Sequence, residues 1–492
     1  MIQVIDIGKG TRLNDYASFA YLSNPVQELR AQAKVWVPKL HGRTVWMVNS
    51  TALGGGVAEM LPKMVDILRE LGVRTEWVVV SPDAKEFFPL TKRIHNSIHD
   101  FGHPGFSADD GCVYNRVSRQ MADEMQTLIA PEDILVIHDP QPLGAGSELK
   151  QRLGMKAIWR CHIGLDRHTL VTDAAWNFLK PYTKNYDHTV FSAQEYVPSF
   201  LMEKASIITP AIDPLSDKNR DLLGPELMNI LCKSGLHKNG LHPFLASRWK
   251  RQVKRLQPDG SFANANKNNE IGLLFHPVVT QVSRWDRLKG WETLLEAFVR
   301  FKRSCKHNGK KKSSHYRRAN AVQLLLAGPE PAAVQDDPEG KGVLDELCTF
   351  YRKLAPEDQK SVVLLTLPMS SRTQNHLMVN AIQRCSSLVV QNSLQEGFGL
   401  TATEAMWKKI PVLGTFSCGL RQQIRDGIDG RLTANPKDPK EIAENLDYML
   451  TSSAKLEKWG RQAQHRVYNQ FLIFSQVQKW LQCLSAVSNG SG

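Results

Sequence analysis

From residue 43 onwards, short apolar runs alternate with longer stretches in which apolar residues recur at helical spacing. This alternation is typical of parallel strands joined by helices. In the first half of the chain it predicts a helix over 57–71 and strands over 43–50, 75–81, 133–139, 156–162 and 188–193. These elements would form one doubly wound sheet.

A second series of the same kind follows an Asn-rich stretch. It predicts strands over 277–283, 322–328, 361–367, 387–393 and 411–415, and helices over 290–303, 374–384 and 399–408. The repeat indicates two similar α/β lobes facing a central cleft, where the carboxyl ends of parallel strands bind ligands. We expect the lobes to span 1–212 and 213–472, with a junction near 208–216 and a terminal helix over 473–488 that packs back onto the first lobe.

Composition fits a soluble protein of two domains, with 492 residues, 42% of them hydrophobic and 23% charged. The net charge of +13 arises almost entirely from residues 218–270 and 302–318. Both segments are poor in apolar runs, so we interpret them as insertions that form mobile, solvated surface loops. Binding to a polyanion is the alternative, but a single-stranded nucleic acid would call for more interleaved aromatic residues.

The eight cysteines are scattered, without a CxxC pair or the spacing of a zinc site. They indicate reduced thiols in a cytoplasmic protein and no metal site. The N-terminus lacks the apolar core of a signal peptide, and no run of about 18 apolar residues occurs. We therefore expect neither export nor a membrane span.

Polar residues that could carry chemistry follow several of the predicted strands. Three glycines, residues 54–56, come after the first strand and open a helix. Without a Cβ they would let backbone amides approach a ligand, although a tight packing turn would also use them. Asp139 and His162 each end a later strand of the same sheet. They could be a turn cap and a core histidine, but their shared edge favours a common ligand with hydroxyl groups.

In the second lobe, Arg284 follows a strand and Lys289 precedes a helix. Two cations ahead of a helix N-terminus favour an anion site, which Arg287 could share, over a merely solvated charge cluster.

The stretch after strand 387–393 holds Glu396, a turn at Gly397-Phe398-Gly399, and a helix from about Leu400 that contains Glu404. The free amides of that helix N-terminus would face a phosphate. The two glutamates lie too far apart for the acid and base pair of a hydrolase. We expect them to bind different partners, namely hydroxyls of a transferred group and the diol of a ribose.

Together these motifs resemble those of the retaining glycosyltransferases of family 4. The motifs "NSTALGGGVAEML", "WRCHIGLD", "AIDPLSDKN", "QVSRWDRLKG" and "EGFGLTATEAMWKKIPVLG" are similar to those of the group formed by the trehalose glycosyltransferring synthase and the retaining trehalose phosphorylase. The resemblance covers about residues 40–216 and 275–475 and implies a GT-B fold of two Rossmann-like lobes. Cys418 departs from it, because relatives tend to carry glycine there.

The resemblance also implies a role for each matching residue. Arg284 and Lys289 would hold the diphosphate of the donor, and Glu404 its ribose. Glu396 and the amides of Gly397, Phe398, Gly399 and Leu400 would hold the donor glucose. Gly55, Gly56, Asp139 and His162 would position the acceptor sugar or the reacting glucosyl unit. The residues expected to be catalytic are Arg284, Lys289, Glu396, His162 and Asp139.

The implied reaction transfers glucose from a nucleoside diphosphate glucose to free glucose and forms α,α-trehalose reversibly. In the family it needs no metal or other cofactor, and relatives often form homodimers. A phosphorylase that uses inorganic phosphate is the nearest alternative. A non-catalytic GT-B protein that binds polyanions through its basic insertions is an alternative of another class.

Overall fold

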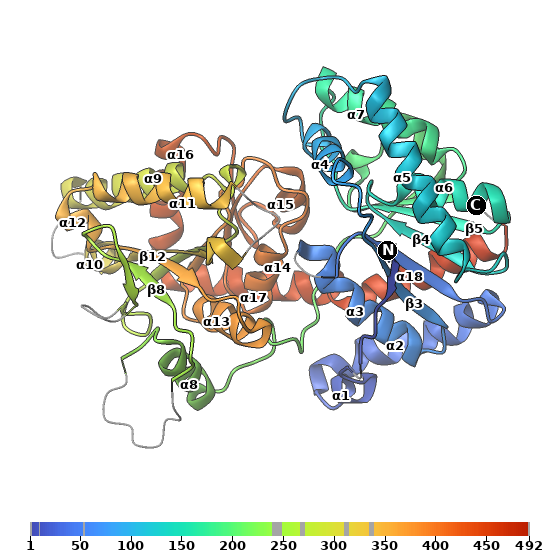
Figure 1. The fold of residues 1–492 in the computed structure, drawn as a ribbon. Helices are drawn as coiled ribbons and strands as arrows, with labels where there is room; N and C mark the ends of the chain where they lie inside the picture. Colours follow the sequence, from blue (N-terminus) through green and yellow to red (C-terminus); the bar gives the residue numbers. More distant parts are fainter. Residues whose placement is uncertain are drawn as a thin grey trace. The chain divides into compact units, whose positions relative to one another are not determined.

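The computed structural model describes residues 2–8, 10–52, 55–238, 248–265, 271–308, 314–333 and 339–490. The chain divides into two compact units, which Figure 1 shows as ribbons. The first unit comprises Met1–Asp213 and also Phe471–Gly492, and the second comprises Pro214–Gln470. The chain therefore passes twice from one unit to the other.

A sheet of seven strands forms the first unit, in the order β1-β3-β2-β4-β5-β6-β7. The strands are β1 (Ile2–Val4), β2 (Val45–Asn49), β3 (Thr75–Val80), β4 (Ile134–His138), β5 (Lys156–Cys161), β6 (His188–Phe191) and β7 (Ala205–Ile207). Strand β1 is antiparallel to β3, and all other neighbours are parallel. Every residue of β4 is buried, which explains its continuous apolar sequence.

Helices cover this sheet. They are α1 (Leu13–Ala17), α2 (Ala20–Trp36), η1 (Val37–Leu40), α3 (Gly55–Glu70), α4 (Phe87–Ile98), α5 (Ala108–Gln126), α6 (Leu143–Leu153), α7 (Leu170–Thr183), η2 (Gln194–Tyr196), η3 (Ser199–Lys204) and α18 (Ile473–Ser488). Capping boxes fix where two of them begin, Ser107 with Asp110 for α5 and Thr169 with Thr172 for α7. Helix α18, the last of the chain, packs against α2 and α3.

A sheet of eight strands forms the second unit, in the order β15-β14-β13-β10-β11-β12-β8-β9. The strands are β8 (Lys254–Leu256), β9 (Phe262–Asn264), β10 (Val278–Val282), β11 (Gln323–Pro329), β12 (Val362–Leu367), β13 (Leu388–Val390), β14 (Val412–Thr415) and β15 (Gly430–Thr433). Strands β10 to β15 pair in parallel, while β8 is antiparallel to both β12 and β9.

The second sheet is buried on both faces, as a doubly wound sheet requires. In β11, Leu324 and Leu326 belong to one hydrophobic cluster, while Leu325 and Ala327 belong to the other. The helices of this unit are α8 (Gly224–Ser234), η4 (Arg287–Lys289), α9 (Trp291–Asn308), α10 (Ser314–Ala321), η5 (Pro331–Ala333), α11 (Gly340–Arg352), α12 (Pro356–Gln359), α13 (Arg372–Arg384), α14 (Leu400–Trp407), α15 (Cys418–Gln423), α16 (Pro439–Leu450) and α17 (Ser453–Gln470).

The expectation that both basic segments are mobile surface loops is wrong for much of their length. Segment 218–270 contains α8, β8 and β9, and β8 extends the sheet. Segment 302–318 contains the end of α9 and the start of α10. Lys302 is buried and donates hydrogen bonds to the backbone oxygens of Ala319 (3.2 Å) and Val322 (3.0 Å), where a cation stabilises a helix C-terminus. Residues 239–247, 266–270 and 309–313 lie outside the described residues, so the expectation is not tested there.

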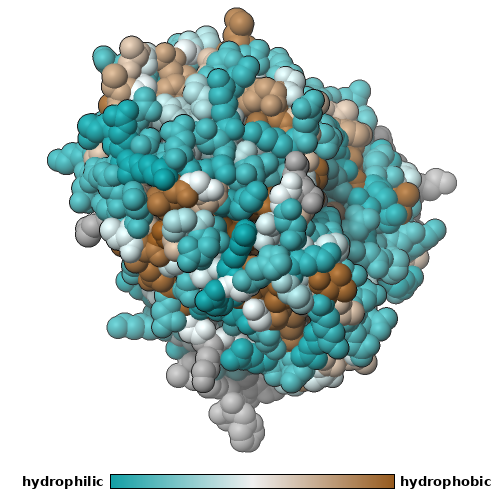
Figure 2. All heavy atoms as spheres, turned by 90° about the vertical axis from the view of Figure 1, so that its right-hand side faces the viewer, coloured by the Kyte–Doolittle hydropathy of each residue, from teal (hydrophilic) through white to brown (hydrophobic). Residues whose placement is uncertain are grey.

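The surface of the protein is mainly hydrophilic on the face drawn, and its cysteines form no disulfides. Figure 2 shows one face on which hydrophilic side chains predominate and hydrophobic ones form small separate groups. Among the residues that the structure describes, no helix combines the length and the apolar character that crossing a membrane would require. All eight cysteines are free thiols.

Candidate active site

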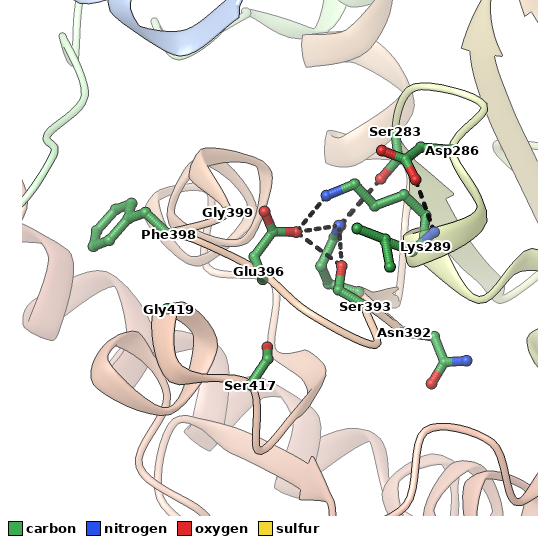
Figure 3. A network of polar contacts seen from close by, with 12 residues as sticks. Ser283, Asp286, Lys289, Asn392, Ser393, Glu396, Phe398, Gly399, Ser417 and Gly419 are labelled. Carbon is green, nitrogen blue, oxygen red and sulfur yellow. Dashed lines mark hydrogen bonds and ion pairs between the residues drawn. The ribbon is translucent and has the colours of Figure 1, made fainter. Parts of the chain in front are cut away.

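Two predicted site residues, Lys289 and Glu396, form an ion pair in the second unit. Lys289 ends η4, just after β10, where Asp286 accepts a hydrogen bond from the Leu288 amide and fixes the turn. Glu396 lies between β13 and α14. Lys289 Nζ is 2.7 Å from Glu396 Oε2, and both side chains are largely buried (Figure 3). The structure thus brings together residues 107 positions apart in sequence.

Two residues that the sequence analysis did not single out complete this site. Gln391 and Ser393 follow β13, and both donate to the oxygen that Lys289 contacts. Gln391 Nε2 lies 3.2 Å and Ser393 Oγ 2.8 Å from Glu396 Oε2. Gln391 Nε2 also lies 3.1 Å from the Ser283 hydroxyl, which follows β10. Both Gln391 and Ser393 are buried. Their polar character at the end of an apolar strand was the available signal.

These contacts decide the charge of Glu396. Burial alone would raise its pKa, but the Lys289 ammonium and the hydrogen bonds from Ser393 and Gln391 outweigh burial, and the net pKa is below the ordinary value. Three donors converge on Oε2, while Figure 3 shows the second carboxylate oxygen directed away from them. Glu396 is therefore an ionised carboxylate held in one orientation.

The Gly-Phe-Gly turn is fixed by close backbone packing. Gly399 has φ +86°, a left-handed conformation that favours glycine, and it is the N-cap of α14, which starts at Leu400. Gly419 donates from its amide to the Glu396 carbonyl at 3.0 Å. A Cβ on Gly419 would lie 2.5 Å from Cα of Phe398, so no larger residue fits there without a shift. Cys418, which departs from the resemblance described above, is buried at the start of α15.

The two arginines near Lys289, Arg284 and Arg287, are both exposed. Arg287 makes a bidentate pair with Glu346, at 2.8 and 2.6 Å, on the exposed surface. The suggestion that it shares the anion site with Arg284 and Lys289 is therefore not supported. Arg284 is exposed on the loop after β10.

Glu404 lies inside α14 and has a different set of neighbours from Glu396. It is buried, and its Oε1 is 3.7 Å from Lys218 Nζ. Lys408, one turn later, is also buried and donates to Gln383 Oε1 at 2.8 Å and to the Glu404 carbonyl at 3.0 Å. Burial lowers the pKa of Lys408 to about 7, against the opposing effect of the Glu404 charge. The two glutamates thus do not form one acid and base couple.

In the first unit, the structure brings Asp139 and His162 into direct contact. Asp139 follows β4 with φ +65°, and its Oδ1 accepts a hydrogen bond from the His162 amide at 2.8 Å. His138, the last residue of β4, lies beside the His162 ring, with Nδ1 3.0 Å from Nε2. Arg160, in β5, is buried, and its backbone lies opposite that of His138 in the register of the two parallel strands. The sequence analysis did not single out His138 or Arg160, since both lie inside strands.

Burial dominates the electrostatics of this second group. It raises the pKa of Asp139 to about 6, although the His162 amide and the Arg160 charge act in the opposite direction. Burial, with a smaller contribution from Arg160, lowers the pKa of His138 to about 3. For the same reasons the pKa of His162 lies well below its ordinary value. Both imidazoles are therefore neutral at neutral pH.

The glycine-rich loop leads into helix α3. Gly55 and Gly56 are its first two residues, and Gly54 lies outside the described residues. Asn49 shapes the start of the loop, since its amide donates to the Thr51 carbonyl at 2.6 Å. Within the described ranges, no group of three or more His, Cys, Asp or Glu side chains is arranged to hold a metal ion.

Known proteins resemble this chain in both sequence and fold. Residues 47–198 match the model of the N-terminal domain of trehalose synthase, and residues 267–466 match that of glycosyl transferases group 1. The trehalose synthase of Thermococcus litoralis is 30% identical over 480 residues, which cover 97% of this chain and 98% of that protein. The chain belongs to the trehalose synthase family.

Two more distant matches are also named for reactions of trehalose or its phosphate. The trehalose phosphorylase of Grifola frondosa is 24% identical over 88% of this chain and 56% of its own length. The alpha,alpha-trehalose-phosphate synthase (UDP-forming) of Burkholderia vietnamiensis matches 90% of this chain and 98% of its own, with a TM-score of 0.65 and 15% identity. That likeness shows the GT-B fold. The chain is thus a retaining family 4 hexosyltransferase of trehalose-related chemistry.

Proposed function

We propose that the enzyme transfers glucose from a nucleoside diphosphate glucose to the anomeric hydroxyl of free glucose. The α configuration is retained, α,α-trehalose forms, and the reaction is reversible. The observation that carries this proposal is the ordered pair of Lys289 and Glu396, a cation and a carboxylate held 2.7 Å apart ahead of the N-terminus of α14. A donor with a diphosphate and a sugar offers a partner to each of them.

Each group of the second unit has a part in donor binding. Lys289 and Arg284 hold the diphosphate, Glu396 and the amides from Gly397 to Leu400 hold the glucose, and Glu404 holds the ribose. Lys289 and Glu396 neutralise one another until the donor supplies phosphate oxygens for the ammonium and hydroxyl groups for the carboxylate. Because Gln391 and Ser393 also hold Glu396 Oε2, the carboxylate keeps its place when Lys289 turns to the donor.

Catalysis comes from electrostatic stabilisation of the leaving group. As the bond between the glucosyl carbon and the phosphate oxygen breaks, negative charge grows on the diphosphate and the sugar becomes oxocarbenium-like. Arg284, Lys289 and the amides at the start of α14 stabilise that charge more in the transition state than in the ground state. The departing phosphate oxygen takes the proton of the acceptor hydroxyl on the same face of the sugar. No side chain needs to act as a nucleophile.

The first unit supplies the groups that position the sugars. Asp139 and His162 bind hydroxyls of the acceptor or of the reacting glucosyl unit, and Gly55 and Gly56 approach it with their backbone. Support comes from the hydrogen bond that locks His162 to Asp139 and from the neutral state of the histidine, which suits an uncharged ligand.

A product assay tests the proposal. The enzyme is incubated with glucose labelled with 13C at C1 and with each of a panel of nucleoside diphosphate glucoses, in phosphate-free buffer. Carbon NMR identifies the product. We expect α,α-trehalose with at least one donor, together with release of the nucleoside diphosphate. Hydrolysis of the donor without transfer, or no reaction with any of them, contradicts the proposal.

The phosphorylase is the second candidate, favoured by the 24% identity to the Grifola frondosa enzyme. In that reaction inorganic phosphate takes the place of the nucleotide, and Glu404 has no ribose to bind. Phosphate-dependent cleavage of trehalose to glucose 1-phosphate, with no activity toward nucleoside diphosphates, would support it.

A further inference from the structure

His138 and His162 form a hydrogen-bonded pair of imidazole rings at the ends of β4 and β5. The facing nitrogens, His138 Nδ1 and His162 Nε2, are 3.0 Å apart. The ring planes differ by 14° and the centroids are 5.3 Å apart. The centroid separation exceeds the distance between the nitrogens by about two ring radii, so the rings meet edge to edge in a common plane. This is the geometry of an N–H···N hydrogen bond and not of face-to-face stacking.

The surroundings of His138 decide which ring donates. The residue is 1% exposed, and its other nitrogen, Nε2, is buried without a hydrogen-bond partner among the described residues. If the proton of His138 were on Nε2, a buried N–H would lack an acceptor, which is destabilising. With the proton on Nδ1, that buried nitrogen carries only a lone pair, which protein interiors tolerate better than an orphaned donor.

Neither ring carries a second proton. Burial lowers the pKa of His138 to about 3, and the buried guanidinium of Arg160, whose Cα pairs with that of His138, adds positive charge on the same face of the sheet. The pKa of His162 is also well below its ordinary value. The pair therefore shares one N–H between two neutral rings.

We propose that His138 sets the tautomer of His162, so that His162 presents an N–H donor from Nδ1. His138 donates Nδ1–H to His162 Nε2, which must then be unprotonated, and the proton of the His162 ring lies on Nδ1. His138 is a positioning residue, since it acts through His162. That the oxygen which His162 meets belongs to a sugar rests on the proposed function; the tautomer does not.

The proposed tautomer limits the hydrogen bonds and proton transfers in which His162 can take part. His162 is partly exposed, and its Nδ1 makes no hydrogen bond within the described residues, so an N–H there is available to a ligand. The lone pair of the ring is already occupied by His138. His162 can therefore donate a hydrogen bond to a ligand oxygen, but it cannot accept the proton of an attacking hydroxyl. The proton of the acceptor must pass to another group, as the proposed transfer to the departing phosphate requires.

Nitrogen NMR of the intact enzyme labelled with 15N-histidine tests the tautomer without reference to activity. Single substitutions His138→Asn and His162→Asn assign the resonances. At neutral pH we expect both rings to be neutral, with His162 protonated on Nδ1 and unprotonated on Nε2. A proton on His162 Nε2, or an imidazolium at either ring, overturns the proposal. If the product assay shows no transfer, this result still decides the tautomer.

Two matched substitutions of His138, with a third to an apolar residue, test the positioning role. An asparagine amide nitrogen takes the place of Nδ1 of a histidine, whereas a glutamine amide nitrogen takes that of Nε2. We expect His138→Asn to restore the donor and stay within about threefold of wild-type kcat, while His138→Gln and His138→Leu lose about tenfold, as for one hydrogen bond. Circular dichroism and Tm of all three variants identify any that fails to fold. Equal losses in folded Asn and Gln variants overturn the role, since a purely structural residue would not distinguish them.

Discussion

The two groups of polar side chains occupy equivalent places in their sheets, after buried parallel strands, yet the pKa values of their carboxyl groups shift in opposite directions. In the second unit Glu396 is ionised, because Lys289, Gln391 and Ser393 outweigh the cost of burial. In the first unit the partner of Asp139 is a peptide N–H, and burial prevails and raises its pKa to about 6. Topology fixes where ligands bind, but the nearest partners decide whether a site carries charge. The charged site formed by Lys289 and Glu396 suits a departing diphosphate, and the neutral imidazoles of the first unit suit a sugar.

Removing either of the two cations proposed for the diphosphate, Lys289 or Arg284, should have the largest effect on catalysis. We expect Lys289→Ala or Arg284→Ala to lower kcat/KM by roughly 100-fold, since a preorganised contact to developing charge is worth about 3 kcal/mol. Steady-state kinetics with the active donor measure this loss. Arg287→Ala is the matched control on η4, because Arg287 pairs with Glu346 on the surface. Wild-type rates for the Lys289 and Arg284 variants, or an equal loss for the control, would contradict the assignment.

The raised pKa of Asp139 predicts a pH-dependent stability effect. A carboxyl whose folded pKa exceeds its unfolded pKa stabilises the protein at low pH, and that contribution is lost as pH rises through about 6. Asp139→Asn keeps an acceptor for the His162 amide and removes this loss. Relative to wild type, its free energy of unfolding should therefore rise by about 2 kcal/mol between pH 4 and 7.5.

Urea denaturation at several pH values measures this difference. Glu396→Gln sharpens the comparison, since a carboxylate with a lowered pKa contributes stability above its unfolded pKa and loses it as pH falls. The difference for Glu396→Gln should change with pH in the opposite direction. The same sign of change for both variants would show that the two sites do not differ as described.

Gln391 tests whether the orientation of Glu396 matters. We expect Gln391→Met to lower kcat by roughly tenfold, as the loss of one hydrogen bond to a charged group implies. Ser283 and Ser393 also lose a partner, so Tm is measured alongside the kinetics. Gln27→Met, at an exposed position of α2 in the first unit, is a control for the same change of side chain. A normal kcat in a folded Gln391 variant would remove the positioning role.

Substitution of Glu404 should have the smallest effect of these changes, and the effect should be on nucleotide binding. Glu404→Gln removes the acceptor charge proposed for the ribose, and we expect the Kd of a nucleoside diphosphate to rise by several-fold, about 1 kcal/mol. Isothermal titration calorimetry measures it. Glu444→Gln, an exposed carboxylate on α16, serves as the control. An unchanged Kd for Glu404→Gln would exclude the ribose role.

Much of the fold could be predicted from sequence, because buried parallel strands appear as apolar runs. The runs at 133–139 and 361–367 correspond to β4 and β12, which are wholly or almost wholly buried. Strand β8 could not be found in this way. It is three residues long, begins Lys-Arg and pairs on one side with the short β9, and charged residues are usual near sheet edges.

Only part of the candidate site could be predicted from sequence, because the ends of strands can be located in a sequence but the contacts between them cannot. Asp139, His162, Lys289 and Glu396 follow strands, and the edge of a parallel sheet is where ligand groups gather. That Lys289 pairs with Glu396, however, depends on the order of strands in the sheet, because β10 is the neighbour of β13. His138 was hidden in an apolar run, and its importance appears only when its ring is seen beside that of His162.

The central claim is that the second unit binds a nucleoside diphosphate as the leaving group, and a competition experiment tests it most directly. The enzyme is given trehalose together with equal concentrations of a nucleoside diphosphate and inorganic phosphate, and phosphorus NMR follows the products. We predict that nucleoside diphosphate glucose accumulates while inorganic phosphate is left unchanged. Formation of glucose 1-phosphate, with the nucleoside diphosphate left intact, would contradict the claim.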